Sequence, residues 1–155
     1  MKINDAIFGE LEYEYGWIKD TTIDFCGKES EISIMIDGEE DGEIDEEQYE
    51  SYTSLMQNWD QLQQGFLQAI LDYYIQKRHE LGYDVEVNES YPLIETINQL
   101  LEKITLVGIT IPFADCFEGR DIGLTFDCIW DIENGLGLRL VNEKIINVGY
   151  QDVAI

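Results

Sequence analysis

The sequence has few basic residues, and this scarcity limits the partners that its surface can bind. Lysine and arginine together number 9 among 155 residues, against 33 aspartates and glutamates, and the formal net charge is -24 at pH 7. Nucleic acids and anionic membranes are bound through basic residues that neutralise phosphate groups. We therefore expect neither as a partner, and a basic protein is the class of partner that the charge favours.

Long apolar runs are also missing. The longest charge-free apolar run, residues 104–114, falls short of the ~18 residues that a membrane-spanning helix requires. The N-terminal residues reach Asp5 and Glu10 without the apolar stretch of a signal peptide. These two absences predict a cytoplasmic protein without a membrane segment.

Cysteine and histidine are too few and too scattered for the usual metal and nucleophile motifs. Cys26, Cys116 and Cys128 form no CxxC pair, and His79 is the single histidine. This pattern argues against a zinc site and against a Cys–His catalytic pair. We expect no cofactor, and we expect the three cysteines to be reduced and mostly buried.

The chain still has enough apolar residues to fold. Its length is typical of a single domain, residues 1–155. Highly charged chains are often disordered, but a hydrophobic content of 45% allows enough burial to offset the conformational entropy lost on folding. Residues 10–15, 17–26 and 31–37 alternate polar with apolar side chains or read as extended segments. They predict a three-stranded antiparallel meander at the N-terminus.

The pattern then changes to a helical period. Residues 45–81 predict one long amphipathic helix, bent or broken at residues 58–60 or at Gly65, and residues 92–103 predict a shorter helix that begins at a proline. The apolar side of the long helix repeats at steps of three and four: Tyr49, Tyr52, Met56, Trp59, Leu62, Phe66, Ile70 and Tyr73.

Four further strands are predicted at residues 105–111, 124–130, 137–141 and 145–150. Strands, then helices, then strands indicate an α+β fold, with an antiparallel sheet covered on one side by the long helix and the shorter helix. We expect one stripe of the long helix, Trp59, Phe66, Ile70 and Tyr73, to pack on Leu124, Phe126, Cys128 and Trp130.

The acidic residues are most concentrated between Asp37 and Glu50, where nine acids occur without a basic residue. This segment is either a solvated loop that keeps the protein soluble or an electrostatic docking site for a basic protein. On the second interpretation, the predicted binding residues are Asp37, Glu39, Glu40, Asp41, Glu43, Asp45, Glu46 and Glu47.

The same segment partly resembles an EF-hand calcium loop. Asp37, Glu39, Asp41 and Asp45 occupy acidic ligand positions of that loop, and a glycine stands at its sixth position. However, Gln48 stands where the loop requires a bidentate carboxylate. Asp45 and Gln48 also fit a helix capping box, which explains the residues without calcium.

A further alternative is a small hydrolase. Asp127, Asp131 and Glu133 flank Trp130, and paired carboxylates beside an aromatic ring can catalyse sugar hydrolysis. Residues 131–135 are also typical of a tight turn, because Asn-Gly can adopt positive φ, and we favour the turn over the hydrolase site.

Residues 122–139 together with 148–152 resemble the C-terminal signature of a family of uncharacterised bacterial domains. The resemblance implies a small bacterial cytoplasmic α+β domain without an assigned reaction, similar in style to the acidic proteins that accompany bacterial toxin systems. The acidic charge, together with the lack of a catalytic motif, leads us to expect a non-enzymatic protein-binding module, such as an immunity-like inhibitor of a cationic toxin.

Overall fold

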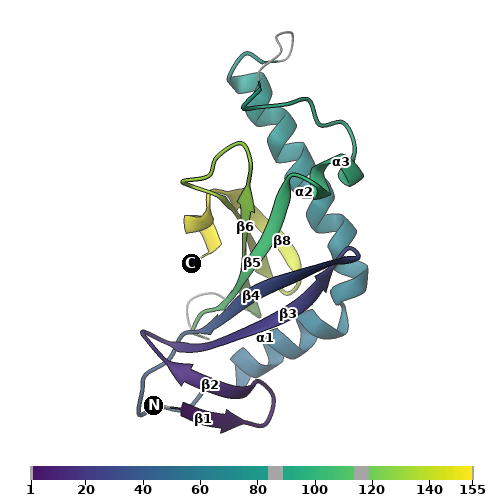
Figure 1. The fold of residues 1–155 in the computed structure, drawn as a ribbon. Helices are drawn as coiled ribbons and strands as arrows, with labels where there is room; N and C mark the ends of the chain where they lie inside the picture. Colours follow the sequence, from purple (N-terminus) through teal and green to yellow (C-terminus); the bar gives the residue numbers. More distant parts are fainter. Residues whose placement is uncertain (1, 84–88, 114–118, 155) are drawn as a thin grey trace.

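The computed structural model describes residues 2–83, 89–113 and 119–154, which form one eight-stranded sheet with helices on one side (Figure 1). The strands follow one another across the sheet in chain order, from β1 to β8. Their bounds are β1 Lys2–Asp5, β2 Gly9–Tyr13, β3 Trp17–Phe25, β4 Lys28–Ile36, β5 Ile104–Ile111, β6 Asp121–Cys128, β7 Leu136–Val141 and β8 Lys144–Gly149.

The α+β class is confirmed, but the expectation of a wholly antiparallel sheet is wrong at one pair of strands. β4 and β5 are parallel, with Ser33 opposite Gly108 and Ile36 opposite Ile111. The three α-helices of the described residues lie in the connection between these two strands. A long helical crossover returns the chain to the same end of the sheet, so the next strand runs in the same direction.

The predicted long helix is divided at Asn58 into α1 (Glu46–Gln57) and α2 (Trp59–Glu80). Asn58 leaves the helical region, with φ -106° and ψ 7°, and its Nδ2 donates to the carbonyl of Ser54 at 2.8 Å. The predicted helix at 92–103 is shorter than expected, because α3 spans only Ile97–Leu101. It begins after Thr96, whose hydroxyl accepts from the backbone N–H of Gln99.

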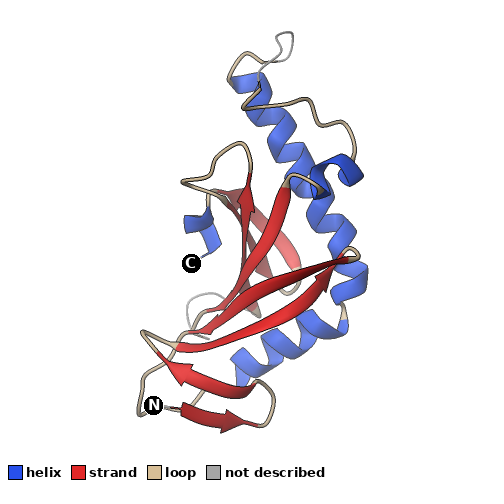
Figure 2. Ribbon diagram, viewed as in Figure 1, coloured by secondary structure: helices blue, strands red, loops and turns tan. Residues whose placement is uncertain are grey.

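The core lies between the helices and one face of the sheet (Figure 2). The ring of Phe25 contacts those of Trp59 and Phe126, with centroids 6.0 and 5.5 Å apart. The stripe expected on α2 is shifted at one position. Tyr74, not Tyr73, is fully buried, and its ring centroid lies 4.4 Å from that of Trp130.

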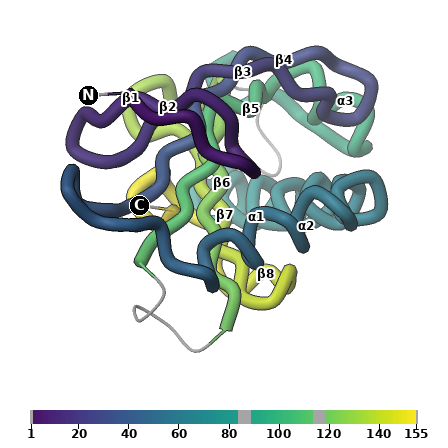
Figure 3. Tube along the Cα trace, turned by 90° about the horizontal axis from the view of Figure 1, so that it is seen from below, coloured from purple at the N-terminus to yellow at the C-terminus, as the bar shows by residue number. Residues whose placement is uncertain are grey.

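On the opposite face of the sheet, the 3-10 helix η1 (Gln151–Ala154) covers strands β6 and β7. Figure 3 shows the C-terminal segment on one side of the curved sheet and α1 and α2 on the other. Gly123 and Gly137 allow this contact, because a Cβ at either position would lie within 2.5 Å of a backbone oxygen of residues 150–154. β6 and β7 are therefore buried on both faces. No helix of the described residues is long and apolar enough to span a membrane.

Candidate functional site

The acidic segment consists of the loop between β4 and α1, residues 37–45, and the first five residues of α1. The first residues of this acidic loop are fixed to the sheet. The backbone N–H of Asp37 donates to the carbonyl of Ile111 at 2.9 Å. The hydroxyl of Tyr13 donates to the carbonyl of Gly38 at 3.0 Å. Within the loop, Gly42 N–H donates to the carbonyl of Glu39 at 3.0 Å and closes a turn. The acids are thus presented on a loop with defined anchor points.

Gln48 fixes the other end of the loop. Its Oε1 accepts from the backbone N–H of Asp45 at 2.9 Å, as the capping box predicts. Its Nε2 lies 2.9 to 3.2 Å from the carbonyl oxygens of Asp37, Ile111 and Pro112. The side chain is only 2% exposed. Gln48 therefore joins α1 to the ends of the parallel strands β4 and β5, and its amide is fully used by backbone groups.

The predicted acidic site divides into an exposed part and one inward residue. Asp37 is half-buried. The other predicted binding residues are exposed: Glu39, Glu40, Asp41, Glu43, Asp45, Glu46 and Glu47. Burial raises the pKa of the Asp37 carboxyl, although the nearby Arg139 guanidinium opposes this effect. Of the four candidate calcium ligands, Asp37 is therefore half-buried, whereas Glu39, Asp41 and Asp45 are exposed to solvent. Among the residues that the structure describes, no three or more Asp, Glu, Cys or His side chains are grouped to hold a metal ion.

A buried ion pair between β6 and β7, close enough to Asp37 to act on its carboxylate electrostatically, was missed by the sequence analysis. Arg139 on β7 donates from Nε and Nη2 to the two carboxylate oxygens of Asp121, at 2.7 and 2.6 Å. Both residues are buried. Arg139 Nη1 also lies 3.5 Å from the carbonyl of Val153 in η1. This bidentate pair connects β6 and β7 to the C-terminal segment, and its position favours a structural role.

A second acidic surface covers the solvent face of the N-terminal strands. Each of three neighbouring strands contributes two exposed acids: Glu10 and Glu12 on β2, Asp20 and Asp24 on β3, and Glu29 and Glu31 on β4. Strand register brings them to one face, since Asp24 pairs with Glu29 across β3 and β4. Two shallow hollows of about 380 and 430 Å3 lie on this face. The alternating acids of residues 10–14 could have indicated this surface from the sequence. The sequence analysis instead placed the binding site where the acids are most concentrated, in residues 37–50.

The three carboxylates of the hydrolase alternative have separate surroundings. Asp131 accepts from the backbone N–H and the side-chain amide of Asn134, at 3.0 to 3.2 Å, as expected of a turn residue. Asp127 is exposed on β6, with Gln151 Nε2 3.4 Å away. Glu133 is exposed in the turn. The hydrogen bonds of Asp131 are those of a residue that stabilises a turn.

The cysteines that the structure describes are free thiols. Cys128 is buried, as expected, and burial raises the pKa of its thiol to about 11. Cys26 is only half-buried, and desolvation together with the carboxylate of Asp24 raises the pKa of its thiol. Cys116 lies outside the described residues. His79 is exposed in the last turn of α2.

These features define a strongly acidic α+β domain whose mixed sheet carries its helices on one face and a fixed acidic loop at the end of the parallel strand pair. Residues 7–155 match the model of the family described as domain of unknown function DUF6985, and the chain belongs to that family. Searches of curated proteins and of solved structures gave no match.

Proposed function

We propose that this protein is a non-enzymatic binding module that docks a basic protein surface, in the manner of a bacterial cytoplasmic immunity protein that inhibits a cationic toxin. The observation that supports this function is the run of exposed carboxylates at residues 39–47, on a loop and the first residues of α1, with anchor points at Tyr13 and Gln48. The acidic face of β2 to β4 adds a second surface of the same sign.

The fixed loop favours binding in two ways. A run of like charges accelerates the encounter with an oppositely charged partner, and the effect weakens as salt rises. Anchoring through Tyr13 and Gln48 also limits the conformational entropy that the loop loses on binding.

The test is charge reversal within the loop. Glu39, Asp41 and Glu43 are all exposed, so their replacement by lysine should leave the fold intact. A partner is first isolated with the wild-type protein at low and high salt, and its association rate is then measured for each variant. We expect the triple variant to associate more slowly and with a weaker salt dependence.

A matched control reverses the same number of charges elsewhere. Glu89, Glu95 and Glu102 are exposed in the connection between α2 and β5, and their replacement by lysine changes the net charge equally. We expect a smaller effect from this control. Equal association rates for the two triple variants would show that only the total charge matters and that the loop is a solubilising segment.

A further inference from the structure

An open groove runs along the solvent side of α1, next to the acidic loop. It has a volume of about 500 Å3 and its surface is mainly apolar. Its floor is one stripe of the helix at steps of three and four, and its two walls come from distant parts of the chain. The lining residues are Ile7, Glu46, Tyr49, Glu50, Thr53, Ser54, Gln57 and Arg120.

The first wall is the turn between β1 and β2. Ile7 is 49% exposed at this turn. Asp5 holds the turn, because its carboxylate accepts from the backbone N–H groups of Ile7 and Phe8 at 2.9 Å and from the hydroxyl of Tyr49 on α1. Burial raises the pKa of Asp5, but these three hydrogen bonds outweigh burial and leave it lowered. The apolar wall is therefore fixed to the floor of the groove.

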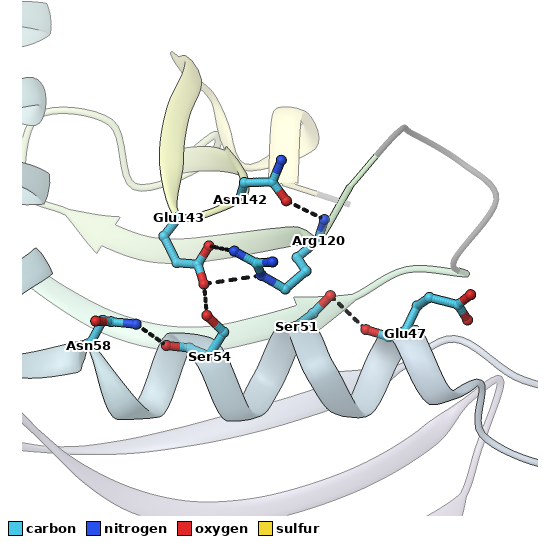
Figure 4. A network of polar contacts seen from close by, with 7 residues as sticks. All are labelled: Glu47, Ser51, Ser54, Asn58, Arg120, Asn142 and Glu143. Atoms are coloured by element: carbon cyan, nitrogen blue, oxygen red, sulfur yellow. Dashed lines mark hydrogen bonds and ion pairs between the residues drawn. The ribbon is translucent and has the colours of Figure 1, made fainter.

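The second wall is Arg120, whose charge is already paired (Figure 4). Its Nε and Nη2 donate to the carboxylate oxygens of Glu143 at 3.2 and 2.7 Å, and Ser54 on α1 donates to the same carboxylate. The backbone N–H of Arg120 donates to Asn142 Oδ1 at 2.9 Å. Glu143 balances the charge of Arg120, and Glu50 also attracts Arg120 electrostatically. The lining carboxylates Glu46 and Glu50 therefore leave the groove with a net negative charge.

We infer that this groove receives one bulky apolar side chain from a basic segment of the partner, while flanking lysine or arginine residues of that segment meet Glu46 and Glu50. The inference rests on the proposed function and names its anchor point. Glu46, the first residue of α1, directly follows the acidic loop and lines the groove, so the two surfaces are continuous. An apolar anchor surrounded by charged contacts is a common arrangement in protein interfaces.

Charge complementarity distinguishes this occupant from the others. An anionic ligand would meet Glu46 and Glu50, with the Arg120 guanidinium already engaged by Glu143. A second copy of the chain would bring another formal charge of -24 to the same surface. A basic segment meets neither obstacle.

The experiment uses synthetic peptides as probes and the backbone amide signals of the isotope-labelled protein as the readout. One short amphipathic peptide contains leucine and lysine, a second has its leucines replaced by serine, and a third has its lysines replaced by glutamate. We expect the first peptide alone to bind with shifts centred on α1 and Ile7. Absence of binding, equal binding of the serine peptide, or shifts confined to β2–β4 would overturn the inference.

Two variants and a matched control locate the binding. Thr53→Arg fills the groove and adds a cation, Ile7→Ser removes the apolar wall, and Gln64→Arg adds the same cation at an exposed position of α2. We expect the first two to weaken the leucine–lysine peptide about tenfold or more, which is about 1.4 kcal/mol, and the control to change it little. Unchanged affinity in Thr53→Arg would refute the groove, whereas the proposed function fails separately, through the charge-reversal experiment on the loop.

Discussion

The contact between β6 and the C-terminal 3-10 helix provides the sharpest test of the fold. At Gly123 an added Cβ would lie 1.9 Å from the carbonyl oxygen of Ala154 and 2.7 Å from its carbonyl carbon. These are backbone atoms, which have no alternative rotamer, so Gly123→Ala must push η1 away from the sheet. Ala154 is fully buried, and Gln151 Nε2 donates to the carbonyl of Phe126 at 2.8 Å. Displacement of η1 would expose Ala154 and break the hydrogen bond between Gln151 and Phe126.

The expected cost follows from these contacts. Overpacking a buried site costs about 1–3 kcal/mol, and a lost hydrogen bond adds about 1 kcal/mol. We therefore expect Gly123→Ala to lower the free energy of unfolding by about 2–4 kcal/mol, measured by urea denaturation. Gly65→Ala is the matched control, because a Cβ at this helical position meets nothing within 4 Å. That variant should gain about 0.5–1 kcal/mol.

A double-mutant cycle with a chain that ends at Tyr150 tests the mechanism. Without η1, the alanine at position 123 has no carbonyl to meet, so its cost should fall by at least about 1 kcal/mol. A cost that is the same in both backgrounds would show that the alanine acts on the sheet itself. Wild-type stability of Gly123→Ala in the full-length chain would refute the close approach altogether.

Two further predictions concern buried polar groups. Gln48→Glu places a carboxylate beside three carbonyl oxygens and should cost about 2–4 kcal/mol in urea denaturation; a calcium-dependent recovery of stability would contradict this and favour the calcium loop. The raised pKa of Cys128, about 11 against 9.0, means that its stabilising contribution is complete below about pH 9 and is lost as pH rises through 11. Cys128→Ala should flatten the alkaline fall of the urea midpoint, and an unchanged fall would assign it to tyrosines instead.

Features with local sequence signals were predictable. Strands β2 to β8 have alternating, continuously apolar or turn-bounded patterns, and Asn58 marks the helix break with a residue that is weak in helices. The exceptions lacked such a signal. Strand β1 has only four residues, and it is defined by pairing with β2, from Lys2 opposite Glu12 to Asp5 opposite Gly9.

Nonlocal contacts account for the other errors. The direction of β5 relative to β4 depends on where the helices return the chain, which periodicity does not encode. Arg139 stands on the strand face opposite Leu138 and Leu140, and alternation alone predicts that such a residue is exposed. It is buried because η1 folds back over that face. The glycines at positions 123 and 137, on the same face, were the available signal for that close approach.

The two interpretations of the acidic loop differ in what they predict for stability and binding together. Like charges held close on a fixed loop repel one another, so reversal of Glu39, Asp41 and Glu43 should leave thermal stability unchanged or raise it slightly. A loop that only maintains solubility would then show better stability without any loss of association. A docking loop would show better stability together with slower association, because residues selected for binding are often not those that favour the compact state. The joint measurement separates the two interpretations, and a variant that loses stability would contradict the repulsion argument on which both depend.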